Sequence, residues 1–130
     1  MTDKLDQIFK LQRELNDRIG LPLFSAMNED IRIGWVLRFS RAMGQELAEL
    51  VDSTPWKWWA KYQKFDIDNA RIEVVDMLHF LVSLAQVLGL TADDLFDLYA
   101  KKHKVNQKRQ DSGYSRKTKD DKHVKIGRKK

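Results

Sequence analysis

Apolar residues recur every three to four positions along four stretches of this chain, which is the spacing of one face of an α-helix. The four stretches cover residues 3–19, 28–52, 66–88 and 91–112. No stretch alternates between apolar and polar residues in the way that a half-buried strand does. The pattern therefore predicts an all-α fold, a bundle of four to five helices.

Residues that favour helix ends stand at the predicted boundaries. Asn28 is a good N-cap, and the acids that follow it suit the positive end of a helix dipole. Asp66 or Asp68 can cap the third helix, and Gly89 can take the left-handed conformation that closes it. Thr91 opens a capping-box pattern in which an Asp replaces the usual Glu or Gln.

The third predicted helix is apolar over about half of its circumference, whereas a single bundle helix usually needs a narrower stripe. Its polar positions gather in one arc and are Glu73, Asp76, His79, Ser83 and Gln86. The excess of apolar surface indicates burial on two sides and predicts a homodimer. A closely packed four-helix protomer would also use such a surface.

Two pairs of acids, each three residues apart, are the candidate metal ligands. They are Glu46 with Glu49 and Glu73 with Asp76, so each pair occupies one side of its helix. Helical spacing places all four among apolar neighbours, where unpaired ionised carboxylates would be costly. A hard divalent cation, Mg²⁺ or Mn²⁺, would compensate their charge. The alternative is that the pairs lie on the solvated faces of two amphipathic helices.

The composition is that of one globular domain. The chain has 130 residues, of which 42% are hydrophobic and 33% charged, and it contains no Cys, which excludes disulfides and thiolate metal sites. Its N-terminus lacks the apolar core of a signal peptide, and no apolar run approaches the length of a membrane span. We therefore expect a cytoplasmic protein with no membrane partner.

Charge is divided unevenly along the chain. Residues 1–100 hold 11 Lys and Arg against 16 Asp and Glu, whereas residues 101–130 hold 13 against 3. Such a basic arm suits phosphate, either of a nucleotide or of a nucleic acid. Residues 115–130 have almost no apolar side chains, so we expect them to be disordered without a ligand.

Two groups of polar or aromatic residues are candidate contacts for a base. Gln12 and Asn16 lie one helical turn apart, on or beside the apolar stripe of the first helix. Their alternative role is to be exposed or to cap a neighbour. Trp58 belongs to the run Pro-Trp-Lys-Trp-Trp. Such clusters more often plug a core or anchor an interface, but a base can stack on one of the rings.

Lys102, Asn106 and Arg109 follow one another at spacings of four and three residues, which aligns them on one face of the last predicted helix. This face is suited to gripping phosphate. The alternative is a solvated basic helix end, which is favourable to the helix dipole.

Several kinds of chemistry are excluded. No Gly-rich loop follows a strand, there is no Cys nucleophile, and no Ser has a convincing triad setting. Asp76 and His79 have the spacing of one Glu-x-x-His motif, but di-iron bundles need two such motifs and two further Glu. Metal-assisted phosphoryl chemistry remains, in which carboxylates hold the metal and one carboxylate activates water.

Three segments resemble the dimeric dUTPases of the all-α nucleoside triphosphate pyrophosphatase superfamily. They are residues 46–59, 72–80 and 102–114. The paired acids alone are shared with MazG-like and dCTP pyrophosphatases. The Pro-Trp-Lys-Trp-Trp run and the Asn-x-x-Arg segment followed by Gly-Tyr are more specific.

The resemblance implies a dUTP diphosphatase that hydrolyses dUTP, and also dUDP, to dUMP with release of pyrophosphate or phosphate. Mg²⁺, or Mn²⁺ as a substitute, would be bound by Glu46, Glu49, Glu73 and Asp76. The catalytic residues would be Glu49, as the base that activates water, and Glu46. The phosphates would be held by Lys102, Asn106, Arg109 and Tyr114. The uracil and deoxyribose would be surrounded by Gln12, Asn16, Trp58 and His79.

The chain lacks the helical insertion that many members of this family carry before the basic segment. We therefore expect a minimal version from a bacterium or a phage, with a catalytic domain over residues 1–114 and a flexible basic tail over residues 115–130. A pyrophosphatase for dCTP or for several deoxynucleotides is the alternative within this class. Outside it, the tail would suit a nucleic-acid-binding or regulatory module. The paired acids disfavour nucleic acid as the primary ligand.

Overall fold

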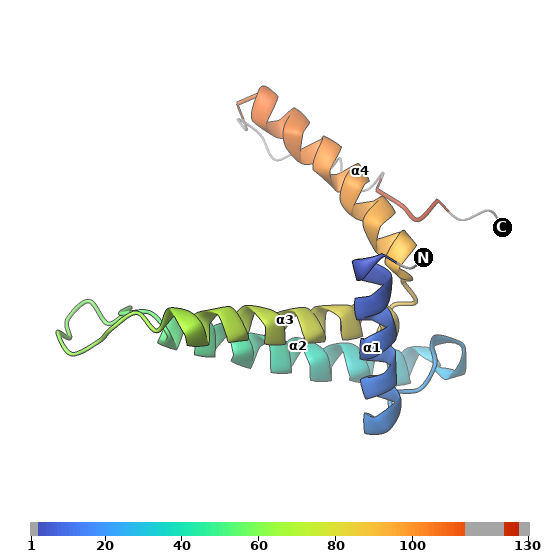
Figure 1. Ribbon diagram of the computed structural model, residues 1–130. Helices are drawn as coiled ribbons and strands as arrows, with labels where there is room; N and C mark the ends of the chain where they lie inside the picture. Colours follow the sequence, from blue (N-terminus) through green and yellow to red (C-terminus); the bar gives the residue numbers. More distant parts are fainter. Residues whose placement is uncertain (1–2, 114–123, 128–130) are drawn as a thin grey trace. The chain divides into compact units, whose positions relative to one another are not determined.

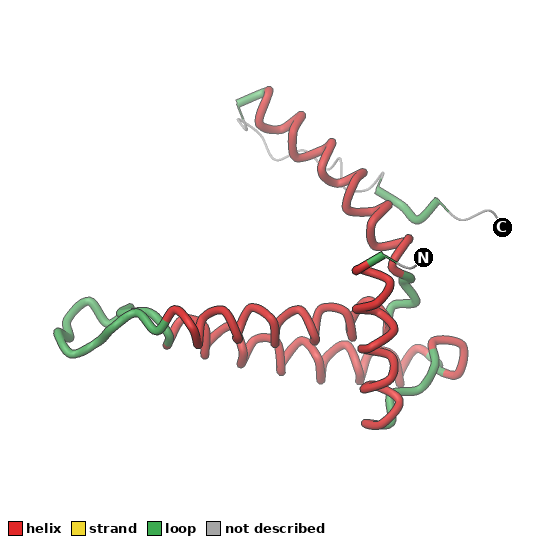
Figure 2. Tube along the Cα trace, viewed as in Figure 1, coloured by secondary structure: helices red, strands yellow, loops and turns green. Residues whose placement is uncertain are grey.

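The computed structural model describes residues 3–113 and 124–127, and the regular secondary structure in them is helical throughout (Figures 1 and 2). The elements in chain order are α1 Lys4–Ile19, the short 3₁₀ helix η1 Phe24–Ala26, α2 Glu29–Asp52, α3 Ile67–Val87 and α4 Ala92–Asp111. The predicted all-α class is confirmed. The chain divides into two compact units, which are Met1–Gly89 and Leu90–Lys130. The predictions for Tyr114 and for residues 115–123 and 128–130 fall outside the described residues.

Side-chain caps fix the starts of the helices where the local sequence predicts them. Asn28 Oδ1 accepts a hydrogen bond of 2.9 Å from the backbone three residues on. Of the two candidate caps for α3, Asp66 is the one observed, since its Oδ1 accepts from the Asn69 N–H at 3.1 Å. Thr91 and Asp94 each accept from the other's backbone N–H, at 3.1 and 2.9 Å, which completes the capping box.

In the first unit, α2 and α3 run side by side as an antiparallel hairpin, and α1 packs across α3 near its C-terminal end (Figures 1 and 2). Phe39 on α2 and Phe80 on α3 join the two helices, with ring centroids 6.2 Å apart. The core at this end is formed by Leu21, Met27, Phe39 and Val87, with Trp35, Val36, Phe80 and Leu84 packed against it. It packs α2 and α3 against the connection between α1 and α2, which supplies Leu21 and Met27.

The connection over residues 53–66 closes the opposite end of the hairpin and carries exposed aromatic rings. Ser53 is buried, and its hydroxyl accepts a 2.7 Å hydrogen bond from an Asn side chain of α3. Trp56, Trp58 and Trp59 are 44, 88 and 60% exposed, and their rings meet edge to face. Within this chain these three tryptophans therefore do not fill the core, which leaves the roles of interface anchor and ligand contact.

The apolar surplus predicted for α3 is visible as an exposed face of that helix. This apolar face consists of Val74, Val75, Leu78 and Leu81, whose exposed fractions run from 39 to 56%. None of the individual helices in the described residues combines the length and the apolar character of a membrane-spanning helix.

In the second unit, α4 is described together with residues 124–127, which form neither helix nor strand. Lys101 Nζ forms an ion pair of 2.9 Å with Asp97 and donates a 2.8 Å hydrogen bond to the carbonyl of Lys125. This part of the basic tail thus contacts the helix that precedes it.

Candidate active site

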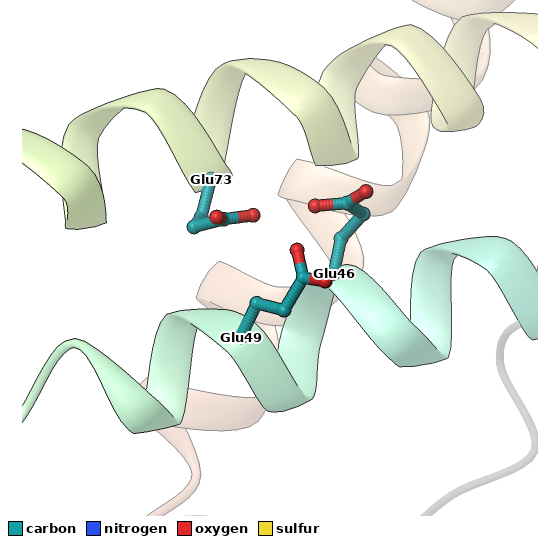
Figure 3. A group of neighbouring side chains, drawn as sticks. All are labelled: Glu46, Glu49 and Glu73. Carbon is teal, nitrogen blue, oxygen red and sulfur yellow. The ribbon is translucent and has the colours of Figure 1, made fainter.

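Three of the four predicted metal ligands converge between α2 and α3 (Figure 3). Glu46 and Glu49 extend from α2, and Glu73 faces them from α3. One carboxylate oxygen from each residue lies within 4.8 Å of the corresponding oxygens of the other two. The three-residue spacing puts the first two carboxylates on the side of α2 that faces α3, and the packing of the hairpin supplies the third.

The three carboxylates are partly removed from water. Glu73 is 7% exposed, whereas Glu46 and Glu49 are partly buried. Oε2 of Glu46 and Oε2 of Glu73 are buried, and no group in the described residues donates a hydrogen bond to either atom. A buried carboxylate oxygen without a donor is costly. Three oxygen ligands at this separation fit a hard divalent cation such as Mg²⁺, which prefers carboxylate oxygen.

Mutual proximity raises the pKa of two of these acids. For Glu46 the largest cause is a side-chain hydrogen bond with Glu73. A bond with Glu49 lowers the pKa of Glu46 in part, while burial and the charges of Glu73 and Asp76 raise it further. For Glu49 the largest cause of the raised pKa is a side-chain hydrogen bond with Glu46. Without a cation, Glu46 and Glu49 therefore hold their protons to a higher pH than an ordinary glutamate does, and a bound cation would favour their ionised forms.

Asp76, the fourth predicted ligand, lies outside the three-carboxylate group but beside it. Together with Glu46 it lines a cavity of about 440 Å³, here called the carboxylate cavity. Apolar side chains of α1, α2 and α3 form other walls of this space, among them Leu15, Phe39 and Phe80. The site therefore combines an acidic wall with an apolar one.

Gln12 and Asn16 also line the carboxylate cavity, but they are only 5 and 0% exposed. Gln12 Nε2 donates to Asn16 Oδ1 at 3.0 Å, and Gln12 Oε1 lies 2.7 Å from His79 Nδ1. Asn16 Nδ2 donates to Gln86 Oε1 at 2.8 Å, and Ser83 Oγ donates to Asn16 Oδ1 at 3.3 Å. The side-chain amides of Gln12 and Asn16 thus link α1 to α3 through hydrogen bonds and are buried. Their contact with a base stays a prediction.

The two other predicted nucleoside contacts lie in different settings. His79 lines the carboxylate cavity and also a second, mainly apolar cavity of about 240 Å³ between α1 and α3. Trp58 is 88% exposed on the 53–66 connection and is not among the residues that line either cavity. Of these two residues, His79 shares the carboxylate cavity with Glu46 and Asp76, whereas Trp58 does not line it.

The predicted phosphate contacts Lys102, Asn106 and Arg109 lie on α4, in the second unit. Asn106 is exposed, Lys102 is partly buried and Arg109 is 6% exposed. Tyr114, the fourth predicted contact, falls outside the described residues. The contact of these residues with phosphate stays a prediction.

Sequence reasoning gave no role to Ser83 and Gln86, which the structure joins to the amides of α1. The available signal was their periodicity, because they continue the polar arc of α3 beyond Asp76 and His79. Their partner Asn16 lies 67 and 70 residues away in sequence, respectively. The helical period predicts which side of α3 is polar, but it does not predict which residues of other helices contact that side.

Comparison with known proteins places the chain in a family. The profile of the dUTPase family matches residues 4–86 and 82–114. The chain is also similar to two curated dCTP pyrophosphatases. With that of Enterobacteria phage T4 it shares 38% identity over 74 residues, which are 48% of this chain and 43% of the relative. With that of Enterobacteria phage LZ5 it shares 31% identity over 83 residues, which are 55% of this chain and 48% of the relative.

The chain therefore spans less than half the length of these curated relatives. No solved structure matches it. The family match is more extensive, since it includes the three converging glutamates, Asp76 and the basic face of α4. The all-α structure agrees with this match, and the chain belongs to the all-α, dimeric dUTPase family.

Proposed function

We propose that this chain is a metal-dependent nucleotide pyrophosphatase that hydrolyses dUTP, and also dUDP, to dUMP. The second product is pyrophosphate from dUTP and phosphate from dUDP. The observation that carries the proposal is the convergence of Glu46, Glu49 and Glu73 beside a cavity of about 440 Å³. Ligands for a hard cation next to a space for a nucleoside are what this reaction requires. Family membership supports the class of substrate.

The proposed Mg²⁺ or Mn²⁺ ligands are Glu46, Glu49, Glu73 and Asp76. When bound, the cation would neutralise phosphate oxygens and favour the attack of water on phosphorus. Glu49 is the proposed base, whose carboxylate takes a proton from the attacking water. A new oxygen–phosphorus bond forms at the β-phosphorus as the bond to the bridging α-phosphate oxygen breaks. The dUMP then leaves with that oxygen, and the new bond completes pyrophosphate.

The basic face of α4 is proposed to hold the phosphates. Lys102 and Arg109 supply charge, Asn106 supplies a hydrogen-bond donor, and Tyr114 would close over the bound substrate. The concentration of Lys and Arg in residues 101–130 supports this assignment, because 13 of the 24 basic residues fall there.

The nucleoside is proposed to enter the carboxylate cavity, with its base against the apolar wall formed in part by Phe39 and Phe80. Gln12, Asn16 and His79 then surround the uracil and deoxyribose. The family resemblance also assigns Trp58 to the base, although this residue lines neither cavity in the single chain. These contacts follow the family resemblance, and the position of His79 between two cavities supports its part in them.

A dCTP pyrophosphatase is the second candidate within the same class. The observation that favours it is the similarity to two phage proteins that are dCTP pyrophosphatases. Uracil and cytosine have the same ring and differ at the N3 and C4 positions, so a few polar contacts decide between them.

Rates of hydrolysis with dUTP, dCTP and dTTP, each with Mg²⁺, separate these candidates. We expect the highest kcat/KM for dUTP. The highest value for dCTP would establish the alternative, and no hydrolysis of any of the three would contradict the proposed class.

The protein is further proposed to act as a homodimer. The apolar face of α3 leaves four large side chains 39 to 56% exposed, and a second copy is the partner that a dimeric family suggests. A stable association through this face would bury more than about 1,000 Å² in total.

A further inference from the structure

A series of hydrogen bonds, here called the relay, links the backbone of α1 to His79, and in each of them the donor and the acceptor can be assigned. Its members are Phe9, Gln86, Asn16, Gln12 and His79. It begins at the carbonyl oxygen of Phe9, which accepts a 2.9 Å hydrogen bond from Gln86 Nε2. A carbonyl has no proton to give, so this contact fixes which end of the Gln86 amide faces Phe9. Gln86 Oε1 is then the acceptor for Asn16 Nδ2, at 2.8 Å.

The same logic orders the next two links. Because Asn16 Nδ2 is directed to Gln86, Asn16 Oδ1 faces Gln12 and accepts from Gln12 Nε2 at 3.0 Å. Ser83 Oγ lies 3.3 Å from the same oxygen, but its shorter hydrogen bond, of 2.9 Å, is to the carbonyl of His79. Gln12 therefore presents Oε1 to His79, and the 2.7 Å contact between Gln12 Oε1 and His79 Nδ1 requires a proton on Nδ1.

This direction decides the chemistry of the other ring nitrogen. In a neutral imidazole only one nitrogen carries hydrogen, so a proton on Nδ1 leaves Nε2 with a lone pair. Isolated histidine prefers the opposite arrangement, with its proton on Nε2. His79 is therefore held as a hydrogen-bond acceptor by a relay that starts at Phe9, on a different helix.

Burial makes the relay difficult to reverse. Asn16 and Ser83 are 0 and 1% exposed, and Gln12 is 5% exposed, so water does not readily replace a lost partner. Turning the amides of Gln12 and Asn16 around would set the Asn16 oxygen against the Gln86 oxygen. Two acceptors would then face each other without a proton between them.

We propose that Gln86 is a positioning residue that acts through Asn16 and Gln12 to keep His79 Nε2 as an acceptor for an N–H or O–H of the substrate's nucleoside part. This proposal rests on the proposed function, because it takes the carboxylate cavity as the nucleoside site. The donor is either the N3–H of a uracil-type base or the 3′-hydroxyl of the deoxyribose. Both can donate a proton to a histidine nitrogen, and His79 lines the same cavity as Glu46 and Asp76.

The tautomer of His79 is measured first, in the ligand-free chain, from its ¹⁵N chemical shifts and long-range ¹H–¹⁵N couplings at a pH where the ring is neutral. Nδ1–H is expected in the parent chain. Gln86→Met removes the anchor of the relay with little change in side-chain length, and it should shift His79 towards Nε2–H. Ser83→Ala is the matched control, because it removes a hydroxyl that contacts Asn16 Oδ1 and the His79 carbonyl but does not set the direction of the amides.

Gln12→Met is the second variant, because it removes the acceptor of His79 itself and should cause the same shift. It keeps the proposal testable where Gln86→Met does not fold. Nε2–H in the parent chain, or an unchanged tautomer in the folded methionine variants, would overturn the proposal. This measurement needs no substrate, so it is independent of the proposed function, which fails separately if no nucleotide is hydrolysed.

Substrate analogues then identify the donor. Against dUTP, either N3-methyl-dUTP or 2′,3′-dideoxyuridine triphosphate is expected to lose on the order of tenfold in kcat/KM with the parent chain, mainly through KM. A loss confined to the first analogue identifies the base N–H, and one confined to the second identifies the sugar hydroxyl. The ratio of kcat/KM for dUTP to kcat/KM for the analogue should approach one in Gln86→Met. In Ser83→Ala this ratio should equal that of the parent chain. Equal ratios in the parent chain and Gln86→Met would overturn the role of Gln86.

Discussion

Glu46 on α2 and Glu73 on α3 face each other across the hairpin, each with a buried Oε2 that accepts no hydrogen bond from the described residues (Figure 3). Two carboxylates this close cannot both be ionised without a large electrostatic cost. A proton on one carboxyl or a bound cation would lower this cost. The raised pKa of Glu46 reflects the first arrangement, and the proposed function requires the second.

Divalent cations should stabilise the folded chain. A cation that binds only the folded state adds about 2.7 kcal/mol at 100 times its Kd. Melting temperatures in a chelator and in increasing Mg²⁺ or Mn²⁺ measure this effect, and we expect a rise that saturates. Glu73→Gln should abolish most of the rise. An equal rise in that variant would place the cation elsewhere.

Stability without a cation should fall as pH rises above 4.5, the ordinary pKa of Glu. The pKa values of Glu46 and Glu49 are raised in the folded state, so the folded chain binds more protons than the unfolded chain in this window. The stabilisation is complete below pH 4.5 and is lost as pH passes through the raised values. Urea unfolding in a chelator between pH 4 and 7 measures it.

Mg²⁺ should remove this contribution to the pH dependence, because a bound cation replaces the protons. Glu49→Gln should weaken it in the chelator, since one of the two shifted groups is gone. The quantity to compare is the change in the free energy of unfolding with pH. If it is the same in the parent chain with Mg²⁺, in the parent chain with chelator and in the variant, Glu46 and Glu49 do not take up extra protons in the folded state.

Replacing any of the four acids by its amide should lower the rate of dUTP hydrolysis by a factor on the order of 10² or more, because cation stabilisation is worth several kcal/mol. The four variants are Glu46→Gln, Glu49→Gln, Glu73→Gln and Asp76→Asn. Asp68→Asn is the matched control, since Asp68 lies on α3 with an exposed side chain. Folded variants that stay within a few-fold of the control would contradict the ligand assignment.

The local parts of the fold follow from the sequence because their causes are local. Asn28 and Thr91 cap helices through side-chain contacts with residues three positions away. The apolar period of α3 predicts a wide apolar surface on this helix, and Val74, Val75, Leu78 and Leu81 are exposed on it. Glu46 and Glu49 share a side of α2 because they are three residues apart.

The remaining features depend on contacts between distant segments. Asp66 and Asp68 are the same residue type and are equally suitable as N-caps. In the structure α3 begins at Ile67, so Asp66 is the N-cap. Periodicity treats Asp76 like Glu73, but packing places Glu73 in the carboxylate group and Asp76 on the neighbouring cavity wall. The relay that ends at His79 depends on the packing of α1 across α3, which no local pattern specifies.

The homodimer proposal predicts that one charge on the apolar face of α3 will separate the protomers. Leu81 is 48% exposed in the single chain, so Leu81→Glu should leave the protomer folded and give a monomer of about 15.3 kDa in sedimentation. Arg71→Glu is the control, because it introduces the same side chain at an exposed polar position of α3. A parent chain that sediments as a monomer at micromolar concentration would refute the dimer.

Metal-dependent release of pyrophosphate can be measured by quantifying the first products that the full chain forms from dUTP. We expect dUMP and pyrophosphate in equal amounts with Mg²⁺, neither product in a chelator, and recovery when Mn²⁺ is added. Formation of dUDP and phosphate as the first products, or an unchanged rate in the chelator, would contradict metal-dependent hydrolysis of dUTP to dUMP and pyrophosphate.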